Sequence, residues 1–161
     1  MKKTAFVLAS IIILFVSSSI TFAAEINGVI AIIIGSGDVK YGAKVNVLLT
    51  TKEISVIPVT KDPSQEYDYK KAILLSLGDA WEKVDSEIKN NASYIVSKTT
   101  TNLSGKFNFA NVKPGKYYVV VTWPSTIARH KVFWQVPVDV KSKDIDVELS
   151  NDNFTVPPYF D

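Results

Sequence analysis

The sequence predicts an all-β fold, a seven-stranded antiparallel sandwich into which one α-helix is inserted. Three observations predict this fold. After residue 24, apolar and polar residues alternate at period 2 through most of the chain, as they do in strands with one buried face. Short groups of Gly, Pro, Asn and Asp separate these stretches and mark turns. One segment, about 63–90, instead repeats its apolar residues at helical spacing.

Residues 1–23 have the features of a signal peptide. Lys2 and Lys3 precede the apolar run 6–16, and Thr21-Phe22-Ala23 fits a small-x-small cleavage site. We expect cleavage after Ala23 or one residue later. The alternative is an uncleaved anchor, although the apolar run is shorter than the roughly 20 residues of a membrane span. A lipoprotein anchor is excluded because the chain has no cysteine.

The mature chain, 24–161, has no net charge. Removing Lys2 and Lys3 leaves 16 basic and 16 acidic side chains, so the formal charge of +2 belongs to the signal peptide. A neutral chain gives no electrostatic reason to expect nucleic acid or an anionic membrane as a partner. Without cysteines, the fold depends on its apolar core.

Seven stretches have strand character. They are residues 26–34, 43–49, 94–100, 106–109, 117–123, 132–140 and 145–149. Pro137 favours an edge position for the sixth stretch, because proline cannot donate to a neighbouring strand. Lys113-Pro114-Gly115-Lys116 predicts a type II turn in which Gly115 takes a positive φ.

The predicted helix, 63–90, lies in an insertion, 51–96, between the second and third strands. Asp62 is a candidate cap, Pro63 suits the first helical position, and Gln65 completes a capping pattern. Its apolar stripe is formed by Tyr69, Ile73, Leu77, Trp81, Val84 and Ile88. Because Gly78 costs the helix about 1 kcal/mol relative to Ala, the helix needs tertiary support.

Two locations are open for this helical stripe. Leu48, Tyr118 and Val120 fall on the outward face of their strands, which makes that sheet face unusually apolar. Our hypothesis is that the helix covers this face, with Trp81 near the centre. The alternative is that Leu77, Trp81 and Val84 dock on a partner protein.

One motif resembles a known family. Its residues are Gly105, Phe107, Phe109, Val112, Pro114, Gly115, Tyr117, Val119 and Val121. This pattern resembles the carboxypeptidase regulatory-like domain, and so do residues 25–50 and the rest of 97–150. The resemblance implies a transthyretin-like, Ig-like Greek-key sandwich over 24–150, and a non-catalytic role in a secreted or surface protein. Residues 151–161 form a tail beyond the last predicted strand, either a docking segment or a frayed end.

The sequence offers little catalytic chemistry. There is one histidine, His130, and no cysteine, so a zinc hydrolase lacks its ligands and a serine nucleophile has one candidate base. We expect His130 to be an exposed loop residue. Asp144, Asp146, Glu148 and Asp152 alternate as on an ordinary solvated strand face, so we predict no calcium site. The sequence therefore predicts no enzyme, no metal and no cofactor.

Two main functions remain open, besides the more remote one of an accessory domain that acts on a peptidase in trans. The first is a structural or interaction module of a cell-envelope or extracellular assembly, periplasmic or released from a bacterial cell, with another protein as partner. The second is a carbohydrate-binding module, in which the rings of Tyr118, Trp123 and Trp134, near Phe133, stack on a polysaccharide. The alternative for these aromatic residues is an ordinary place in the core.

Overall fold

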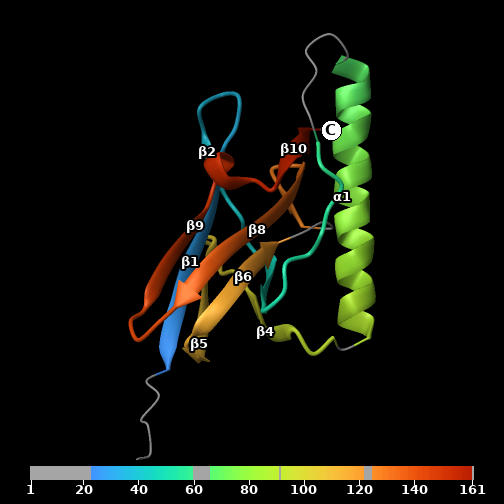
Figure 1. The fold of residues 1–161 in the computed structure, drawn as a ribbon. Helices are drawn as coiled ribbons and strands as arrows, with labels where there is room; N and C mark the ends of the chain where they lie inside the picture. The colour runs from blue at the N-terminus through green and yellow to red at the C-terminus, as the bar shows by residue number, and fades with distance from the viewer. Residues whose placement is uncertain (1–22, 60–65, 91, 122–124, 161) are drawn as a thin grey trace, which may run out of the picture.

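The computed structural model describes residues 23–59, 66–90, 92–121 and 125–160. Two β-sheets pack face to face, and one long helix lies outside them (Figure 1). The described strands are β1 (Ala24–Ile33), β2 (Val39–Tyr41), β3 (Asn46–Thr50), β4 (Ile95–Thr100), β5 (Lys106–Val112), β6 (Gly115–Val121), β7 (Thr126–Ile127), β8 (His130–Val140), β9 (Ile145–Leu149) and β10 (Val156–Phe160). The helix α1 spans Glu66–Lys89, and a 3-10 helix spans Asn151–Asn153.

The first sheet is built around β1, which pairs with β5, β9 and, at its far end, β2. The second sheet has the order β10-β8-β6-β3-β4, with β7 also on β8. The predicted sandwich with one inserted helix is confirmed. One detail of the prediction is wrong, because β1 and β9 run parallel, with Ile26 opposite Ile145. The chain crosses from the second sheet to the first between β8 and β9, and arrives in the direction of β1.

The core between the sheets is formed by the side chains that alternation placed inward. Val47, Leu49 and Val119 are completely buried, and Phe107 and Phe109 meet edge to face with ring centroids 5.8 Å apart. Each inward residue of one sheet packs against the other sheet, as in any aligned sandwich. The period-2 pattern therefore identified this core correctly.

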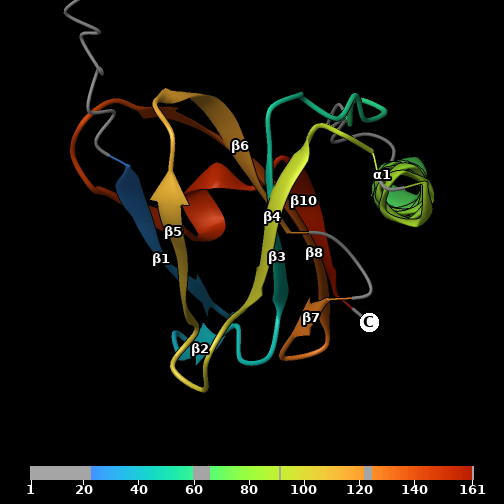
Figure 2. The same cartoon turned by 90° about the horizontal axis from the view of Figure 1, so that it is seen from below.

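The helix covers the outer face of the second sheet, as our hypothesis expected (Figure 2). A second apolar cluster forms there. It contains Leu48, Ile54, Ile73, Leu77, Ala80, Val84, Val120, Phe133 and Val156. Leu77 and Val84 are 2% and 1% exposed, which corrects the alternative that they dock on a partner. Trp81 is half-buried and lies outside this cluster, where Ala80 takes the predicted central place.

The segment before the helix is held by side-chain hydrogen bonds to the protein backbone. The buried Gln135 accepts a bond from the Ile54 N–H (2.7 Å) and donates one to the Ile54 carbonyl (3.1 Å). Ser76 of α1 donates to the Ile57 carbonyl at 2.6 Å, and Lys83 donates to the Ser55 carbonyl at 2.7 Å. These bonds tie residues 54–57 between β8 and the helix.

We predict that Gln135→Leu lowers the free energy of unfolding by about 1–3 kcal/mol, because the buried Ile54 N–H and carbonyl lose their partner. Urea unfolding measures this loss, and hydrogen exchange of the Ile54 amide should accelerate. Lys83→Ala is the control, since it removes a surface bond to the same segment and should cost less than about 0.5 kcal/mol. Equal effects of the two substitutions would contradict a special role for the two hydrogen bonds between Gln135 and Ile54.

The prediction for the turn at residues 113–116 needs correction. Gly115 does not have a positive φ; it begins β6, opposite Val140, while Asn111 carries the positive φ of 58° in this region. Gly115 instead leaves room for Tyr117, because a Cβ there would lie 3.2 Å from the Tyr117 ring. That phenol donates to the Lys113 carbonyl at 2.9 Å and so fixes the turn.

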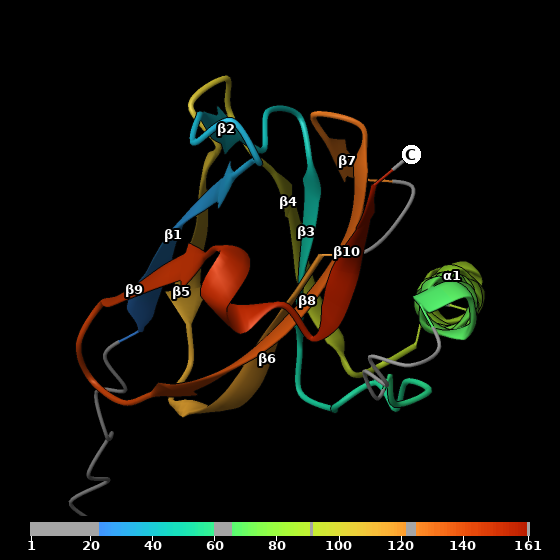
Figure 3. The same cartoon turned by 90° about the horizontal axis from the view of Figure 1, so that it is seen from above.

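Residues 151–160, predicted as a tail, instead form a 3-10 helix and a strand. The 3-10 helix follows β9, and β10 then pairs antiparallel with β8 (Figure 3). Stacking of Phe154 on Trp134, with centroids 4.4 Å apart, holds this turn against the core. Because β10 begins opposite Phe133, the half of β8 that contains Pro137 pairs with β6 alone among the described strands, which agrees with the edge position predicted for this proline.

Candidate interaction surfaces

The aromatic residues predicted to stack on sugars do not form a surface. Trp134 and Phe133 are 0% exposed, and the Trp134 indole donates to the Ser150 carbonyl at 2.9 Å. Tyr118 is half-buried against the helix-side cluster. Trp123 lies outside the described residues. The structure therefore assigns Trp134 and Phe133 to the cores, which was the alternative that the sequence left open.

The prediction that His130 is an exposed loop residue is wrong. His130 is the first residue of β8, opposite Ile127 of β7. It is half-buried, and this burial lowers its pKa. Within the described ranges, no group of three or more His, Asp or Glu side chains is placed to hold a metal ion. Asp144, one of the acidic residues considered for calcium, accepts a hydrogen bond from the Glu25 N–H at 2.8 Å.

The outer face of the first sheet differs from that of the second, because no described helix or strand lies over it (Figure 2). One end of this face is polar. Asn27 of β1 lies opposite Asn108 of β5 and Asp146 of β9. The Asn108 amide donates to Asn27 Oδ1 at 2.8 Å and to Glu25 Oε2 at 3.1 Å. These amides and carboxylates form a row of donors and acceptors across three strands.

The other end of the same face is apolar. Ile33 of β1 pairs with Val39 of β2, and Ala31 pairs with Tyr41, so these four side chains share one face. Ile33, Val39 and Tyr41 are 59%, 50% and 54% exposed. We call Ala31, Ile33, Val39 and Tyr41 the apolar patch. A shallow hollow of about 520 Å³ links this patch to Lys106 and Glu148 nearer the polar row.

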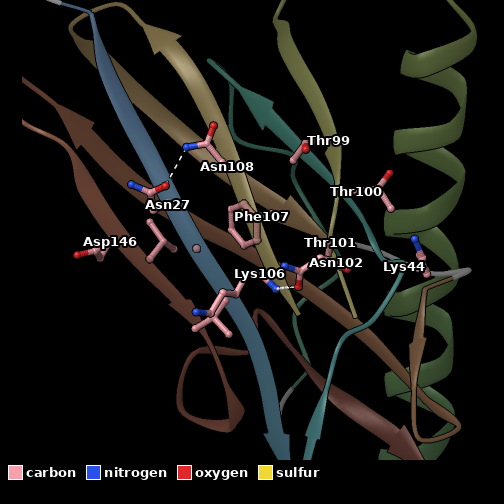
Figure 4. Close-up of a pocket in the computed structure, with 13 residues that line it drawn as sticks. Asn27, Lys44, Thr99, Thr100, Thr101, Asn102, Lys106, Phe107, Asn108 and Asp146 are labelled. Atoms are coloured by element: carbon pink, nitrogen blue, oxygen red, sulfur yellow. Dashed lines mark hydrogen bonds between the residues drawn. The ribbon is translucent and has the colours of Figure 1, made fainter. Parts of the chain in front are cut away.

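A groove of about 840 Å³ runs along the seam between the two sheets (Figure 4). Thr99–Asn102 line it on the side of β4, and Lys106–Asn108 line it on the side of β5. The Phe107 ring lies over Gly28, where a Cβ would be 2.0 Å from the ring, so a side chain at Gly28 would displace it. Lys44 and Lys106 bring two positive charges to this groove, and Asp146 of β9 brings one negative charge.

Asn102 closes one end of the seam. Its backbone N–H donates to the Lys106 carbonyl at 2.9 Å, and its side-chain oxygen accepts from the Lys106 N–H at 3.0 Å. The same oxygen accepts from the Ser104 N–H at 2.9 Å. Asn102 thus takes up the groove-facing hydrogen bonds of Lys106.

Sequence reasoning missed the apolar patch and the groove. The signal for the patch was present, since Val39 and Tyr41 alternate around Lys40 directly after the Gly35–Asp38 loop. Three residues are too few to identify a strand by period alone. The groove has no local signal, because its two sides come from different sheets. No described helix is long and apolar enough to span a bilayer.

No protein-family model matches this sequence, and no curated protein matches it either. The sandwich resembles several solved structures. A candidate carbohydrate-binding protein of Pseudomonas aeruginosa is 17% identical, with a TM-score of 0.47 over 81% of this chain and 89% of that one. A minor pilin of Streptococcus agalactiae is 16% identical, with a TM-score of 0.46 over 81% of this chain and 44% of the pilin.

The major pilin subunit of Bacillus cereus is 11% identical, with a TM-score of 0.41 over 83% of this chain and 30% of the pilin. This chain therefore spans less than half the length of either pilin. At these scores, the roles named for the three proteins are not transferred to it. The predicted membership in the carboxypeptidase regulatory-like family stays a prediction.

Proposed function

We propose that this chain is a secreted, non-catalytic interaction module of a cell-envelope or extracellular protein assembly, built on a carboxypeptidase regulatory-like sandwich. It docks on a partner protein through the apolar patch. The predicted signal peptide supports export, and the absence of a catalytic motif in the sequence supports a binding role.

The observation that carries the proposal is that the outer face of one sheet is covered by the helix and that of the other is not. The apolar outer face of the second sheet is covered by α1, whereas Ile33, Val39 and Tyr41 remain at least half exposed side by side on the first. Contiguous apolar side chains with a polar rim are typical of protein interaction sites. Here Lys106 and Glu148 supply the near part of that rim.

The test is capture of the mature protein from the envelope and medium of its producing cell. We expect a stoichiometric protein to co-purify with the wild type and to be lost with Ile33→Lys. Leu75→Lys is the matched control, because Leu75 is 57% exposed on α1, away from the patch, and should leave capture unchanged. Retention of the partner by Ile33→Lys would refute the patch as the docking site.

A carbohydrate-binding role is the second candidate, and the polar row favours it. Side-chain amides and carboxylates offer the donors and acceptors that sugar hydroxyls need, and Tyr41 presents an exposed ring on the same face. Recovery of polysaccharide instead of protein, lost with Asn27→Ala and Tyr41→Ala, would replace the first proposal by this one.

A further inference from the structure

We infer that the seam groove binds an extended acidic segment of a partner protein, which adds to β4 as a further strand. This site contains none of the four residues of the apolar patch and does not depend on them, although Lys106 lies beside both. Three features of the seam lead to this inference: the open backbone of β4, the chemistry of the groove beside it, and the obstructed edges elsewhere.

The hydrogen bonds of β4 show to which side each residue turns its backbone N–H and carbonyl groups. The Thr101 N–H donates to the Val45 carbonyl at 2.9 Å, so this pair is bonded, and bonded pairs alternate along an antiparallel ladder. The backbone N–H and carbonyl groups of Thr99 and Ser97 therefore point toward β3, where these residues lie opposite Val47 and Leu49. Lys98 and Thr100 turn their N–H and carbonyl groups the other way, where β4 has no partner among the described strands.

The groove lies on this open side. The Ile30 N–H donates to the Gly105 carbonyl at 2.9 Å, so by the same alternation Lys106 and Asn108 of β5 also face the seam. Asn102 occupies the bonds of Lys106, which leaves the seam closed at that end. A strand added to β4 would lie in the groove and extend from the end that Asn102 closes toward the open end.

Other edges of the sandwich are less suited to strand addition. The outer strand β10 contains Pro157 and Pro158, which have no N–H to donate. The edge strand β9 carries two carboxylates, Asp146 and Glu148, and no lysine, so it would repel an acidic segment more strongly than β4, which carries Lys98. By contrast, β4 has the sequence IVSKTT, with β-branched residues and no proline or glycine.

Charge defines the chemistry of the occupant. Lys44 and Lys106 line the groove, and Lys98 is exposed on β4 itself. Asp146 of β9 lines the groove as well, so three positive charges stand against one negative charge. Side chains next to Lys98 on an added strand are favoured if they are Asp or Glu, because opposite charges on neighbouring strands attract. The alternate side chains would face Thr99 and the rim of Phe107, where small apolar residues fit.

The test uses the ¹⁵N-labelled mature protein and a synthetic peptide, acetyl-DVDVDV-amide, with acetyl-KVKVKV-amide as the opposite-charge control. With the acidic peptide we expect the Lys98 and Thr100 amides to exchange hydrogen at least tenfold more slowly. The Thr99 amide, already bonded to β3, should change little. The basic peptide should have no such effect.

Two variants make the test specific. Lys98→Glu should weaken peptide binding about tenfold, whereas Lys143→Glu, the same change at an exposed turn residue, should not. Unchanged exchange at millimolar acidic peptide, or equal effects of both peptides, would overturn the inference. So would changes confined to Val39 and Tyr41, because they would place the peptide on the apolar patch instead.

Discussion

Replacing Trp134 by alanine is expected to cost about 3–5 kcal/mol of stability, the range for removing a large aromatic residue from a core. The indole is completely buried, stacks on Phe154 with an interplanar angle of 18°, and bonds to the Ser150 carbonyl. Its removal would loosen both the core and the turn that leads into β10. Urea unfolding measures the loss as a shift of the midpoint.

Two further variants allow the prediction to be tested even if Trp134→Ala fails to fold. Trp134→Phe keeps an aromatic ring but loses the hydrogen bond. Its free energy of unfolding should lie between those of the wild type and the alanine variant. Tyr41→Ala removes a ring that is 54% exposed and should change stability by less than about 0.5 kcal/mol. A stable Trp134→Ala variant that has lost binding to polysaccharide would instead restore the sugar-stacking hypothesis.

The second large effect is expected for Leu77→Ala, at about 2–5 kcal/mol. Leu77 is 2% exposed and lies in the cluster between α1 and the second sheet. Loss of this contact weakens the attachment of the helix to the sheet, since helices in proteins are stabilised mainly by packing of their apolar face. Urea unfolding and the helical circular dichroism signal measure the effect.

Leu75→Ala provides a matched control for this helix substitution. It makes the same chemical change two residues away on the same helix, so the intrinsic helix propensity changes equally, but Leu75 is 57% exposed. We expect less than about 0.5 kcal/mol. Similar losses for Leu75→Ala and Leu77→Ala would mean that the helix does not pack on the sheet as described, and would reopen docking of its stripe on a partner.

The period-2 pattern was sufficient for most of the sandwich, because each strand buries alternate residues whatever its neighbours are. Trp134 shows where its interpretation failed. It shares its face with Val132 and Val138, and all three are buried. The pattern itself placed Trp134 inward, and only the general affinity of aromatic rings for sugars suggested otherwise.

The error at Trp81 has a geometric cause. Successive steps of four residues turn about 40° beyond a full helical turn, so a stripe with spacing 4 rotates around the helix. Viewed down the helix axis, Trp81 is rotated about 40° from Leu77 in one direction. Ala80 and Val84 are rotated from Leu77 in the opposite direction, as is Ile73. The buried face therefore centres between these residues, and Trp81 falls on its rim.

The interaction surfaces depend on which strands become neighbours, and the pattern of a single segment says little about that. The apolar patch exists because β2 pairs with the far end of β1, and the groove exists because β4 and β5 meet at a corner. The C-terminal strand was missed because Pro157 and Pro158 argue against a strand, although an edge position tolerates them.

The central place of β1 has a consequence for folding kinetics. Apart from the short strand β2, the first described strand finds its partners late, since Asn27 meets Asn108 81 residues on, and Glu25 meets Asp144 119 residues on. The β6–β8 pairing closes a much shorter loop, so we expect the second sheet to form first. φ-values should then be high at Val119 and low at Ile26, and the reverse would contradict this order. Until the residues of β9 have been made, the strand that becomes the middle of the first sheet keeps one edge unpaired over residues 26–30.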